Sequence, residues 1–205
     1  MSILPPGQFK CICADPPWTY SVFSEKGKDR SAEAHYDCMS LADIAMLPVE
    51  AVAAKDAHLF MWVTGPCMVQ GQHLEIMRAW GFRPSSMAFV WIKSKVGTAT
   101  QSCAFIDHHL FVKGMGHTTR QNAEFVILGR RGSPKRLTKA MHQIIISPRR
   151  EHSRKPDEFF KRVEEYCCGP RLEMFARESR QGWESFGDQV TKFDVHFTGE
   201  YGATA

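Results

Sequence analysis

Four consecutive residues, Asp15, Pro16, Pro17 and Trp18, combine chemical groups that could hold an aromatic amine in place. The Asp15 carboxylate and the Pro16 carbonyl can both accept hydrogen bonds, and the two prolines restrict the backbone that carries them. Trp18 or Tyr20 could stack on the ring of such an amine. These residue types suit the exocyclic amino group of a nucleobase. A structural Pro-Pro turn capped by Asp15 is the alternative, and the four residues alone leave it open.

The hydrophobic pattern predicts the elements that must position this tetrapeptide. Helices are predicted from a Ser40–Asp43 cap, over about residues 68–80 before Gly81, and after Pro156. Continuous apolar strands that alternate with helices are typical of an α/β domain, whose largely parallel sheet carries helices on both faces. Ligands of such sheets bind at the carboxyl ends of the strands, so the tetrapeptide and the segment after Ala176 are candidate sites. Apolar runs predict the buried strands over residues 10–14, 58–64, 86–93, 124–129, 143–146 and 172–176.

The composition is that of one soluble globular domain, with 205 residues, 43% of them hydrophobic and 23% charged. No apolar run is long enough to span a bilayer and no signal peptide is visible, so we expect no membrane association and a cytoplasmic location. The formal net charge of +4 permits an anionic partner without requiring one. Seven cysteines without paired Cys-x-x-Cys motifs predict reduced thiols and no metal site, with Cys11 and Cys13 facing opposite sides of a strand.

The tetrapeptide and the strand before it resemble the catalytic signature of the MT-A70 family of S-adenosylmethionine-dependent adenine N6-methyltransferases. The resemblance runs from about Lys10 to Gln189, nearly the whole chain. It implies one Rossmann-like methyltransferase domain over residues 10–190, permuted so that the catalytic strand comes early and the cofactor segment late. Residues 1–9 would be an N-terminal extension and residues 191–205 a C-terminal tail. Six further segments carry the resemblance, in the family's order: Leu59–Gly65, Phe89–Lys93, His117–Phe125, His152–Glu158, Leu172–Arg177 and Trp183–Gln189.

The resemblance implies that Asp15, Pro16, Pro17 and Trp18 are the catalytic residues and that S-adenosylmethionine is the cofactor. Asp15 and Pro16 would hold the N6 amine of adenine in line with the methyl group of the cofactor. The implied reaction is a direct displacement without a covalent enzyme intermediate, whose rate comes mainly from positioning and electrostatics. Because the amine can lose its proton after it has gained charge, Asp15 is expected to orient the amine rather than act as a strong base.

The cofactor-binding residues implied by the resemblance lie mostly late in the chain. The chain departs from the family at two places, since Ala123 stands where lysine is frequent and Ala176 where many relatives have glycine. The residues implied are Glu173, Arg177, Ser179 and Arg180 around the ribose, Asp188 and Gln189 at the ribose, adenine or methionine end, Asn122 near the methionine carboxylate, and Phe9 through its backbone.

Two polar loops, residues 19–36 and 94–120, are expected to flank the catalytic strand end and to meet nucleic acid. A target base in a duplex would be flipped out, or supplied single-stranded. For each cation in this region, a solvated surface charge is the alternative to a phosphate contact. The predicted substrate-binding residues are Tyr20, Lys93, His117, Arg120, Arg149 and Arg150.

DNA is the expected nucleic acid, because no added RNA-binding module is visible in the sequence. Adenine N6-methylation of RNA is the alternative activity. An inactive, nucleic-acid-binding partner subunit is the alternative of another class. It is disfavoured because such subunits tend to lose the acidic and the aromatic residue of the tetrapeptide, and this chain keeps Asp15 and Trp18. A homodimer and a family-type heterodimer both stay open.

Overall fold

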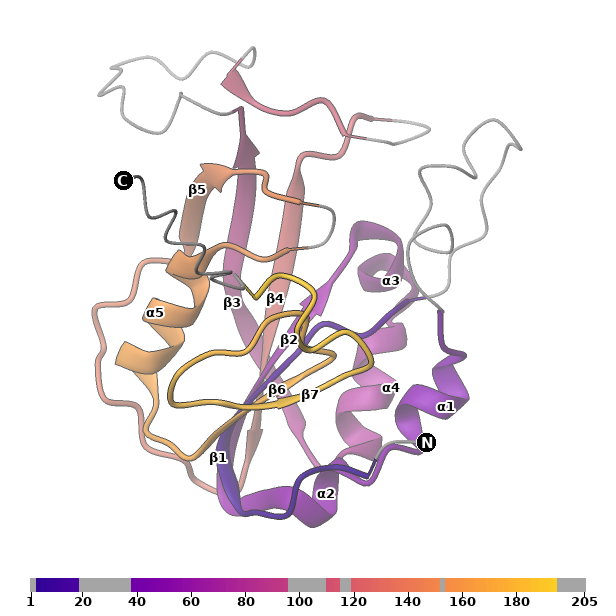
Figure 1. Cartoon of the computed structure of the whole chain (residues 1–205), viewed down its shortest axis with the longest axis vertical. Coiled ribbons are helices and arrows are strands. Elements are labelled where there is room, and N and C mark those ends of the chain that lie inside the picture. The colour runs from indigo at the N-terminus through magenta and orange to yellow at the C-terminus, as the bar shows by residue number, and fades with distance from the viewer. Residues whose placement is uncertain (1–2, 19–37, 96–109, 115–118, 152–153, 195–205) are drawn as a thin grey trace, which may run out of the picture.

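Seven strands form one sheet (Figure 1). The computed structural model describes residues 3–18, 38–95, 110–114, 119–151 and 154–194. The strands are β1 (Phe9–Ala14), β2 (Ala53–Val63), β3 (Arg83–Ser94), β4 (Ala123–Arg131), β5 (Ile144–Pro148), β6 (Arg171–Met174) and β7 (Glu184–Phe186). Their order across the sheet is β5-β3-β4-β2-β1-β6-β7. Each run that the sequence predicts as a strand is a strand in the structure, with ends that differ by a few residues.

Most neighbouring strands run parallel, which confirms the predicted sheet type. β1 is parallel to β2 and to β6, β3 is parallel to β5, and β6 is parallel to β7. Among the described strands, β4 alone runs antiparallel to its neighbours, β2 and β3. Ala14 at the end of β1 pairs with Met61 of β2 and Met174 of β6. The tetrapeptide therefore begins at the edge of the sheet where these three parallel strands end.

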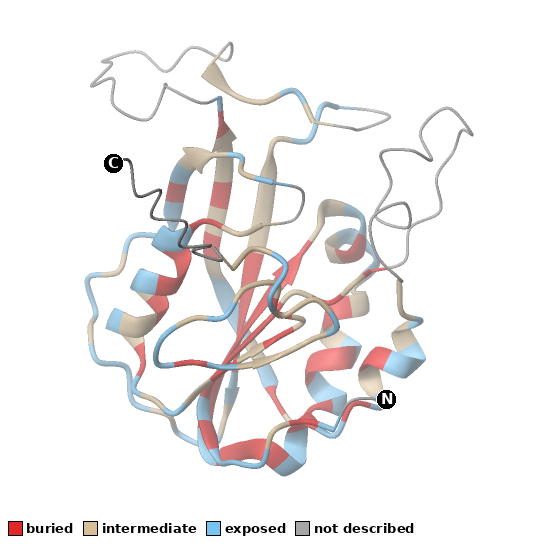
Figure 2. Cartoon of the chain, in the orientation of Figure 1, coloured by how far each residue is buried: buried red, intermediate tan, exposed pale blue. Residues whose placement is uncertain are grey.

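Helices cover both faces of the sheet, as predicted (Figure 1). Four helices pack on one face and bury Ile44, Val49, Ile76 and Met77 against it. The fifth helix covers the other face. Figure 2 shows the result as buried residues along the middle strands between two partly exposed helical layers. The helices are α1 (Leu41–Ala45), α2 (Val49–Val52), α3 (Gly65–Gln70) and α4 (Gln72–Ala79) on the first face and α5 (Asp157–Tyr166) on the second.

The helix ends follow local sequence signals in two places. The Ser40 side chain accepts a hydrogen bond from the Asp43 amide at 3.1 Å, which confirms the predicted cap of α1. The sequence predicted one helix over about residues 68–80. This prediction was wrong, because the chain forms two helices, α3 and α4, with Gly71 between them. Gly71 has a φ of 72°, a left-handed conformation that ends one helix before the next begins. None of the helices in the described ranges is long and apolar enough to cross a membrane.

The second face of the sheet is packed with aromatic side chains. Phe159 of α5 lies against Trp62 of β2 with ring centroids 4.8 Å apart. Cys11 and Cys13 are both buried in this same layer. The prediction that they face opposite sides was wrong, since residues two apart in a strand share a face. The cysteines of the described residues are free thiols, and no group of three metal-ligating side chains occurs in that part of the chain.

A seventh strand extends the sheet beyond β6, which the hydrophobic pattern predicted to be the last. The chain turns after Met174, where Phe175 has a φ of 61°. The Ala176 amide then donates to the Phe186 carbonyl at the end of β7, at 2.9 Å. A Cβ at Gly187 would lie 2.8 Å from the Ala176 carbonyl oxygen, so the close approach of the two segments requires glycine there. The loop that joins β6 to β7 is thereby held across the end of the sheet (Figure 1).

Candidate active site

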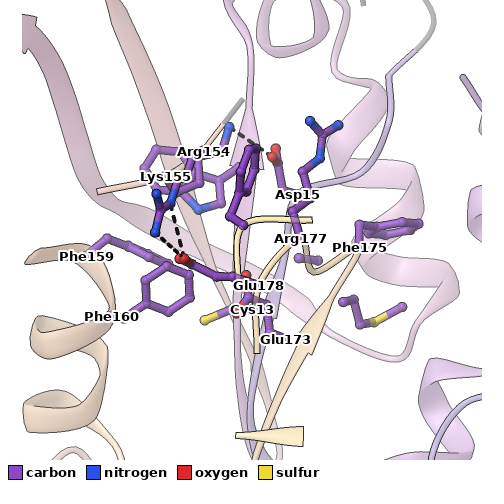
Figure 3. Close-up of a pocket in the computed structure, with 14 residues that line it drawn as sticks. Cys13, Asp15, Arg154, Lys155, Phe159, Phe160, Glu173, Phe175, Arg177 and Glu178 are labelled. Atoms are coloured by element: carbon purple, nitrogen blue, oxygen red, sulfur yellow. Dashed lines mark hydrogen bonds and ion pairs between the residues drawn. The ribbon is translucent and has the colours of Figure 1, made fainter. Parts of the chain in front are cut away.

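A cavity lies at the carboxyl ends of β1 and β6, beside the first residues of α5 (Figure 3). It has a volume of about 30 Å³, because charged and aromatic side chains converge on it. This position matches the site expected for a parallel sheet, outside the carboxyl ends of the strands. The side chains that give it its chemistry are those of Asp15, Lys155, Glu173, Arg177, Glu178 and Phe193.

A row of alternating charges crosses the cavity mouth. The Lys155 ammonium lies 3.0 Å from Asp15 Oδ2 and 2.7 Å from Glu124 Oε2. Lys93 pairs with the other oxygen of Glu124. The Lys155 ammonium also lies 4.8 Å from the centroid of the Trp62 ring. Since the Lys155 side chain is only 10% exposed, these pairs are shielded from solvent and stronger than surface ion pairs.

The environment of these groups shifts their pKa values in a consistent pattern. Burial favours the neutral form of Glu124, but Lys155 and Lys93 outweigh it and lower the pKa of Glu124 to about 2. Burial likewise disfavours charged Lys155, yet Asp15 and Glu124 raise its pKa above the ordinary value. For Asp15 burial dominates, so its pKa is raised even though Lys155 pulls it down. Lys155 is therefore the main group that opposes burial and favours the ionised form of Asp15.

The two prolines and Trp18 form a rigid turn. The Pro16 carbonyl accepts a hydrogen bond from the Trp18 amide at 2.8 Å, and the Pro17 carbonyl accepts one from the Met39 amide at 3.1 Å. A carbonyl has two lone pairs, so the Pro16 oxygen keeps capacity for a second donor. Hydrogen bonds to the Trp18 and Met39 amides thus hold the turn in place at the carboxyl end of β1.

Trp18 does not have the stacking role that its residue type predicted. Its side chain is 2% exposed and packs in the core beneath the first four helices. The indole N–H donates to the Trp62 carbonyl at 3.2 Å. A ring buried in this way anchors the turn to β2 and cannot cover a substrate base. Tyr20, the other predicted stacking residue, lies outside the described residues.

One carboxyl oxygen of Glu173 is buried and has no hydrogen-bond partner among the described residues. Its Oε2 atom is inaccessible to solvent and accepts no hydrogen bond from any described residue. Burial raises the pKa of Glu173 to about 8, although Arg180 opposes the shift. Glu173 pairs with Cys13 across β1 and β6, which places it one residue before the strand end that carries Asp15. An unsatisfied buried acceptor on a cavity wall is suited to a ligand that brings a hydroxyl or amine donor.

Ion pairs close the remaining side of the cavity. Arg154 donates to Glu178 at 2.6 Å, and its guanidinium lies 5.3 Å from the Phe193 ring centroid (Figure 3). Ser179 donates to Asp194 through both its amide and its hydroxyl, at 2.8 and 2.7 Å. These bonds fasten the segment after β7 to the segment after β6.

The predicted cofactor residues separate into two groups. Glu173 and Arg177 line the cavity, as expected. Ser179 and Arg180 lie beside it, because Ser179 bonds to Asp194 and Arg180 stacks over Phe160 at 3.8 Å from the ring centroid. Asp188 is exposed, Gln189 accepts a hydrogen bond from Lys192, and the Asn122 carbonyl accepts one from the Lys93 amide.

The prediction for Phe9 was wrong. Phe9 is buried at the first position of β1, whereas Asp15 follows its last position. Six residues of extended chain span about 20 Å. The backbone of Phe9 therefore belongs to the opposite end of the sheet from the cavity.

The predicted substrate residues are also dispersed. Lys93 is engaged with Glu124, and Arg150 with Asp157 at 2.8 Å. Arg120 and Arg149 are exposed at the cavity end of the sheet, where they precede β4 and follow β5. His117 lies outside the described residues.

Several site residues were missed by reasoning from the sequence. Lys155, Glu124 and Glu178 were not predicted, and neither was Phe193. The sequence did contain a signal for Lys155. This lysine lies directly before the proline that starts a helix, and a helix that follows a parallel strand starts near the carboxyl end of that strand, where the site lies. Glu124 looked like the first residue of an ordinary buried strand, so its pairing with two lysines required the tertiary structure.

The strand order, the helices on both faces of the sheet and the carboxyl side chains at the carboxyl ends of β1 and β6 define a Rossmann-like α/β domain of the methyltransferase type. The MT-A70 family model matches residues 9–189. The chain belongs to the MT-A70 family, and the resemblance seen in the sequence is confirmed.

Known relatives of this chain differ in how much of their length it covers. It is similar to the type II methyltransferase M.MunI of a Mycoplasma species, with 28% identity over 96% of this chain and 85% of that protein. It is 28% identical to an MT-A70-like N(6)-adenosine-methyltransferase of Arabidopsis thaliana, over 90% of this chain and 24% of that protein. It is 26% identical to the N(6)-adenosine-methyltransferase catalytic subunit of Homo sapiens, over 90% of this chain and 28% of that protein. The chain thus spans about a quarter of the length of the plant and human relatives.

Proposed function

We propose that this protein transfers a methyl group from S-adenosylmethionine to the N6 amine of adenine in DNA. The observation that carries the proposal is the position of Asp15. The acid of the family signature lies on the cavity wall at the end of β1, paired with Lys155. Membership of the MT-A70 family supports the reaction type.

Asp15 and the Pro16 carbonyl are the groups that would hold the amine. Both are acceptors, and they are adjacent on a turn that two prolines and the buried Trp18 keep rigid. An exocyclic amine has two N–H donors, so two fixed acceptors determine the direction of its lone pair. The Lys155 ammonium lies 3.0 Å from Asp15, where it favours the ionised form of this carboxyl group and fixes its orientation. As the amine becomes cationic in the transition state, the Asp15 charge stabilises it more than it stabilises the neutral ground state.

The chemistry of the residues around the cavity suits the proposed cofactor, which is itself larger than the cavity of about 30 Å³. S-adenosylmethionine would supply the methyl group of its sulfonium and would leave as the thioether. Glu173 offers a buried acceptor without a partner in the described residues, which suits a ribose hydroxyl. Arg177 and Phe175 line the same cavity after β6.

DNA is favoured by the type of relative that the chain matches along its length. The similarity to the type II methyltransferase M.MunI, a DNA methyltransferase, extends over 85% of that protein. The relatives named for adenosine are matched over about a quarter of their length. RNA methylation is the second candidate, supported by these names. An inactive partner subunit is disfavoured, because Asp15 is present and lies in the cavity.

The experiment is methyl transfer from labelled S-adenosylmethionine to separate pools of DNA and RNA, with modified adenines mapped by sequencing. We expect label in DNA, at the N6 position of adenine, and none with Asp15→Ala. Label in RNA alone would replace DNA by RNA as the substrate. Absence of label in both pools, with a folded protein that binds nucleic acid, would favour the inactive subunit.

A further inference from the structure

A second concave site lies on the α5 face of the sheet, away from the active-site cavity. It is a groove of about 250 Å³ between β3, β4 and the end of α5. Phe60 and Phe89 lie beneath the groove, 1% and 2% exposed and with ring centroids 6.0 Å apart, and the partly exposed Tyr166 on its wall meets Phe60 edge-on at 5.8 Å. Ser86 and Gln143 contribute polar groups at its margin. The groove is large enough for one planar aromatic ring of nucleobase size.

Two arginines border this groove at its outer end. Arg83 of β3 and Arg130 of β4 are directly opposite each other in the antiparallel pair, next to the Ser86–Leu128 pair that lines the groove. Both are exposed, and neither has an acidic partner among the described residues. Like charges directly opposite on two strands destabilise a sheet unless an anion lies between them.

The segment from Gly132 to Gln143 adds further cations and is fixed in place. The Ser133 amide donates to Asp56 at 2.6 Å, and the Leu137 amide donates to the Tyr166 carbonyl at 2.8 Å. At its end, the Gln143 side chain donates to the Met87 carbonyl at 2.9 Å. In Figure 1 this segment runs beside α5. It presents the exposed side chains of Lys135, Arg136 and Lys139.

We propose that this groove binds a nucleotide of a single-stranded nucleic acid segment, with its base packed against the partly exposed Tyr166 and Met141 and its flanking phosphates on Arg83 and Arg130. Phosphates supply negative charge between the two facing arginines, and a base of any identity can pack on an aromatic side chain. The polar margin suits the edge of a base without specifying one.

This groove is distinct from the active-site cavity. Arg130 follows Glu124 by six residues on β4, which places the two about 20 Å apart along the strand. Binding here would hold a part of the nucleic acid that is not being methylated. The proposal concerns binding and stands whether or not the chain transfers methyl groups.

The test is binding of fluorescein-labelled oligothymidine to the full chain, followed by fluorescence anisotropy across a salt series. Arg83→Ala with Arg130→Ala should lower the affinity roughly tenfold at about 0.1 M salt, and reduce the slope of log K against log salt by about 1.4. Ser86→Phe should fill the groove from an exposed strand position. The affinity for the oligonucleotide should therefore fall, while the slope of log K against log salt should not change. Arg78→Ala with Lys10→Ala removes the same charge from exposed sites elsewhere and serves as the matched control. Thermal unfolding verifies that each variant is folded.

Three results would overturn the proposal. An equal loss of affinity in the control variant would mean that net charge alone matters. Unchanged affinity in Ser86→Phe would mean that no base enters the groove. Displacement of the oligonucleotide by adenosine monophosphate at concentrations comparable with those of the oligonucleotide would assign the groove to a free nucleotide. Cross-linking of iodouridine-substituted oligonucleotide to Tyr166 or Met141 would support the proposal, and cross-links confined to the active-site edge would contradict it.

Discussion

The Lys155 ammonium lies between the carboxylates of Asp15 and Glu124, 3.0 Å from one and 2.7 Å from the other. The three side chains come from β1, β4 and the segment that enters α5, so the contact joins both halves of the sheet. Its position explains how an acid whose pKa burial raises can still serve as an anionic acceptor. Lys155 is a positioning residue, because it acts through Asp15.

Replacing Lys155 by methionine should weaken both the fold and the reaction. Breaking a buried ion pair leaves uncompensated charge, so we expect the free energy of unfolding to fall by roughly 3 kcal/mol. The pKa of Asp15 should rise, which moves the acid limb of the pH–rate profile for methyl transfer to higher pH. Lys155→Arg should restore much of the profile. A lower rate with an unmoved acid limb would show that Lys155 does not act through Asp15.

The double variant Lys155→Met with Glu124→Gln separates stability from catalysis. Without Lys155 the Asp15 and Glu124 carboxylates repel each other, so removing the Glu124 charge should recover part of the lost stability in chemical denaturation. Methyl transfer should not recover, since Asp15 still lacks its cation. Recovery of both together would mean that the activity loss came from partial unfolding.

Glu173 should make the protein less stable as pH rises. Its folded-state pKa of about 8 lies above the ordinary value of 4.5, so the folded protein retains a proton that the unfolded chain releases. Stability is full below about pH 4.5 and is lost as pH rises toward 8. Glu173→Gln removes this dependence of stability on pH. The free energy of unfolding of the variant, relative to that of the natural protein, should therefore increase by roughly 2 kcal/mol as the pH rises from 5 to 8. If urea denaturation gives the same difference in free energy of unfolding between variant and natural protein at every pH from 5 to 8, the raised pKa of Glu173 is contradicted.

Trp18 should prove to be a structural residue. Trp18→Phe loses the hydrogen bond to the Trp62 carbonyl and leaves a small cavity, which should cost about 2 kcal/mol in the free energy of unfolding. The KM for nucleic acid should stay unchanged in steady-state assays at a temperature where the variant is folded. A large rise in KM with unchanged stability would restore the stacking role that the residue type predicted.

Arg149 and Arg150 should behave differently although they are adjacent. Arg149 is exposed, so Arg149→Ala should lower the affinity for nucleic acid and reduce the salt slope by about 0.7–0.9. Arg150 pairs with Asp157 at the start of α5, so Arg150→Ala should instead cost about 0.5–1 kcal/mol of stability. Equal effects of the two variants on the salt slope would mean that Arg150 leaves Asp157 to meet phosphate.

The fold could be predicted largely from the sequence because its strands are buried on both faces. Runs such as residues 59–63 and 125–128 are apolar throughout, and the sequence shows helix caps at Ser40 and Gly81. The short β7 could not be predicted, since its three residues carry no periodic pattern and depend on the close approach that Gly187 permits. Gly71 was misread because a single glycine is tolerated within many helices.

The sequence predicted only those parts of the site whose residues are adjacent in the chain. Asp15 and Pro16 are adjacent in the chain, and their chemistry is visible in four letters. The ion pairs of Lys155 join it to Asp15, 140 positions earlier in the chain, and to Glu124, 31 positions earlier, and no local pattern reveals them. Trp18 was misread because residue type gives no information on which way a ring points at a strand end.

The most direct test of the account is a comparison of Asp15→Asn with the natural protein in two measurements on the same samples. Asparagine keeps the shape of the side chain but removes its charge. We predict that methyl transfer to adenine N6 falls by roughly 10²–10³-fold, while the dissociation constant for S-adenosylmethionine in calorimetry changes little. Methyl transfer at the natural rate in Asp15→Asn would contradict the central claim that this carboxylate holds and stabilises the reacting amine.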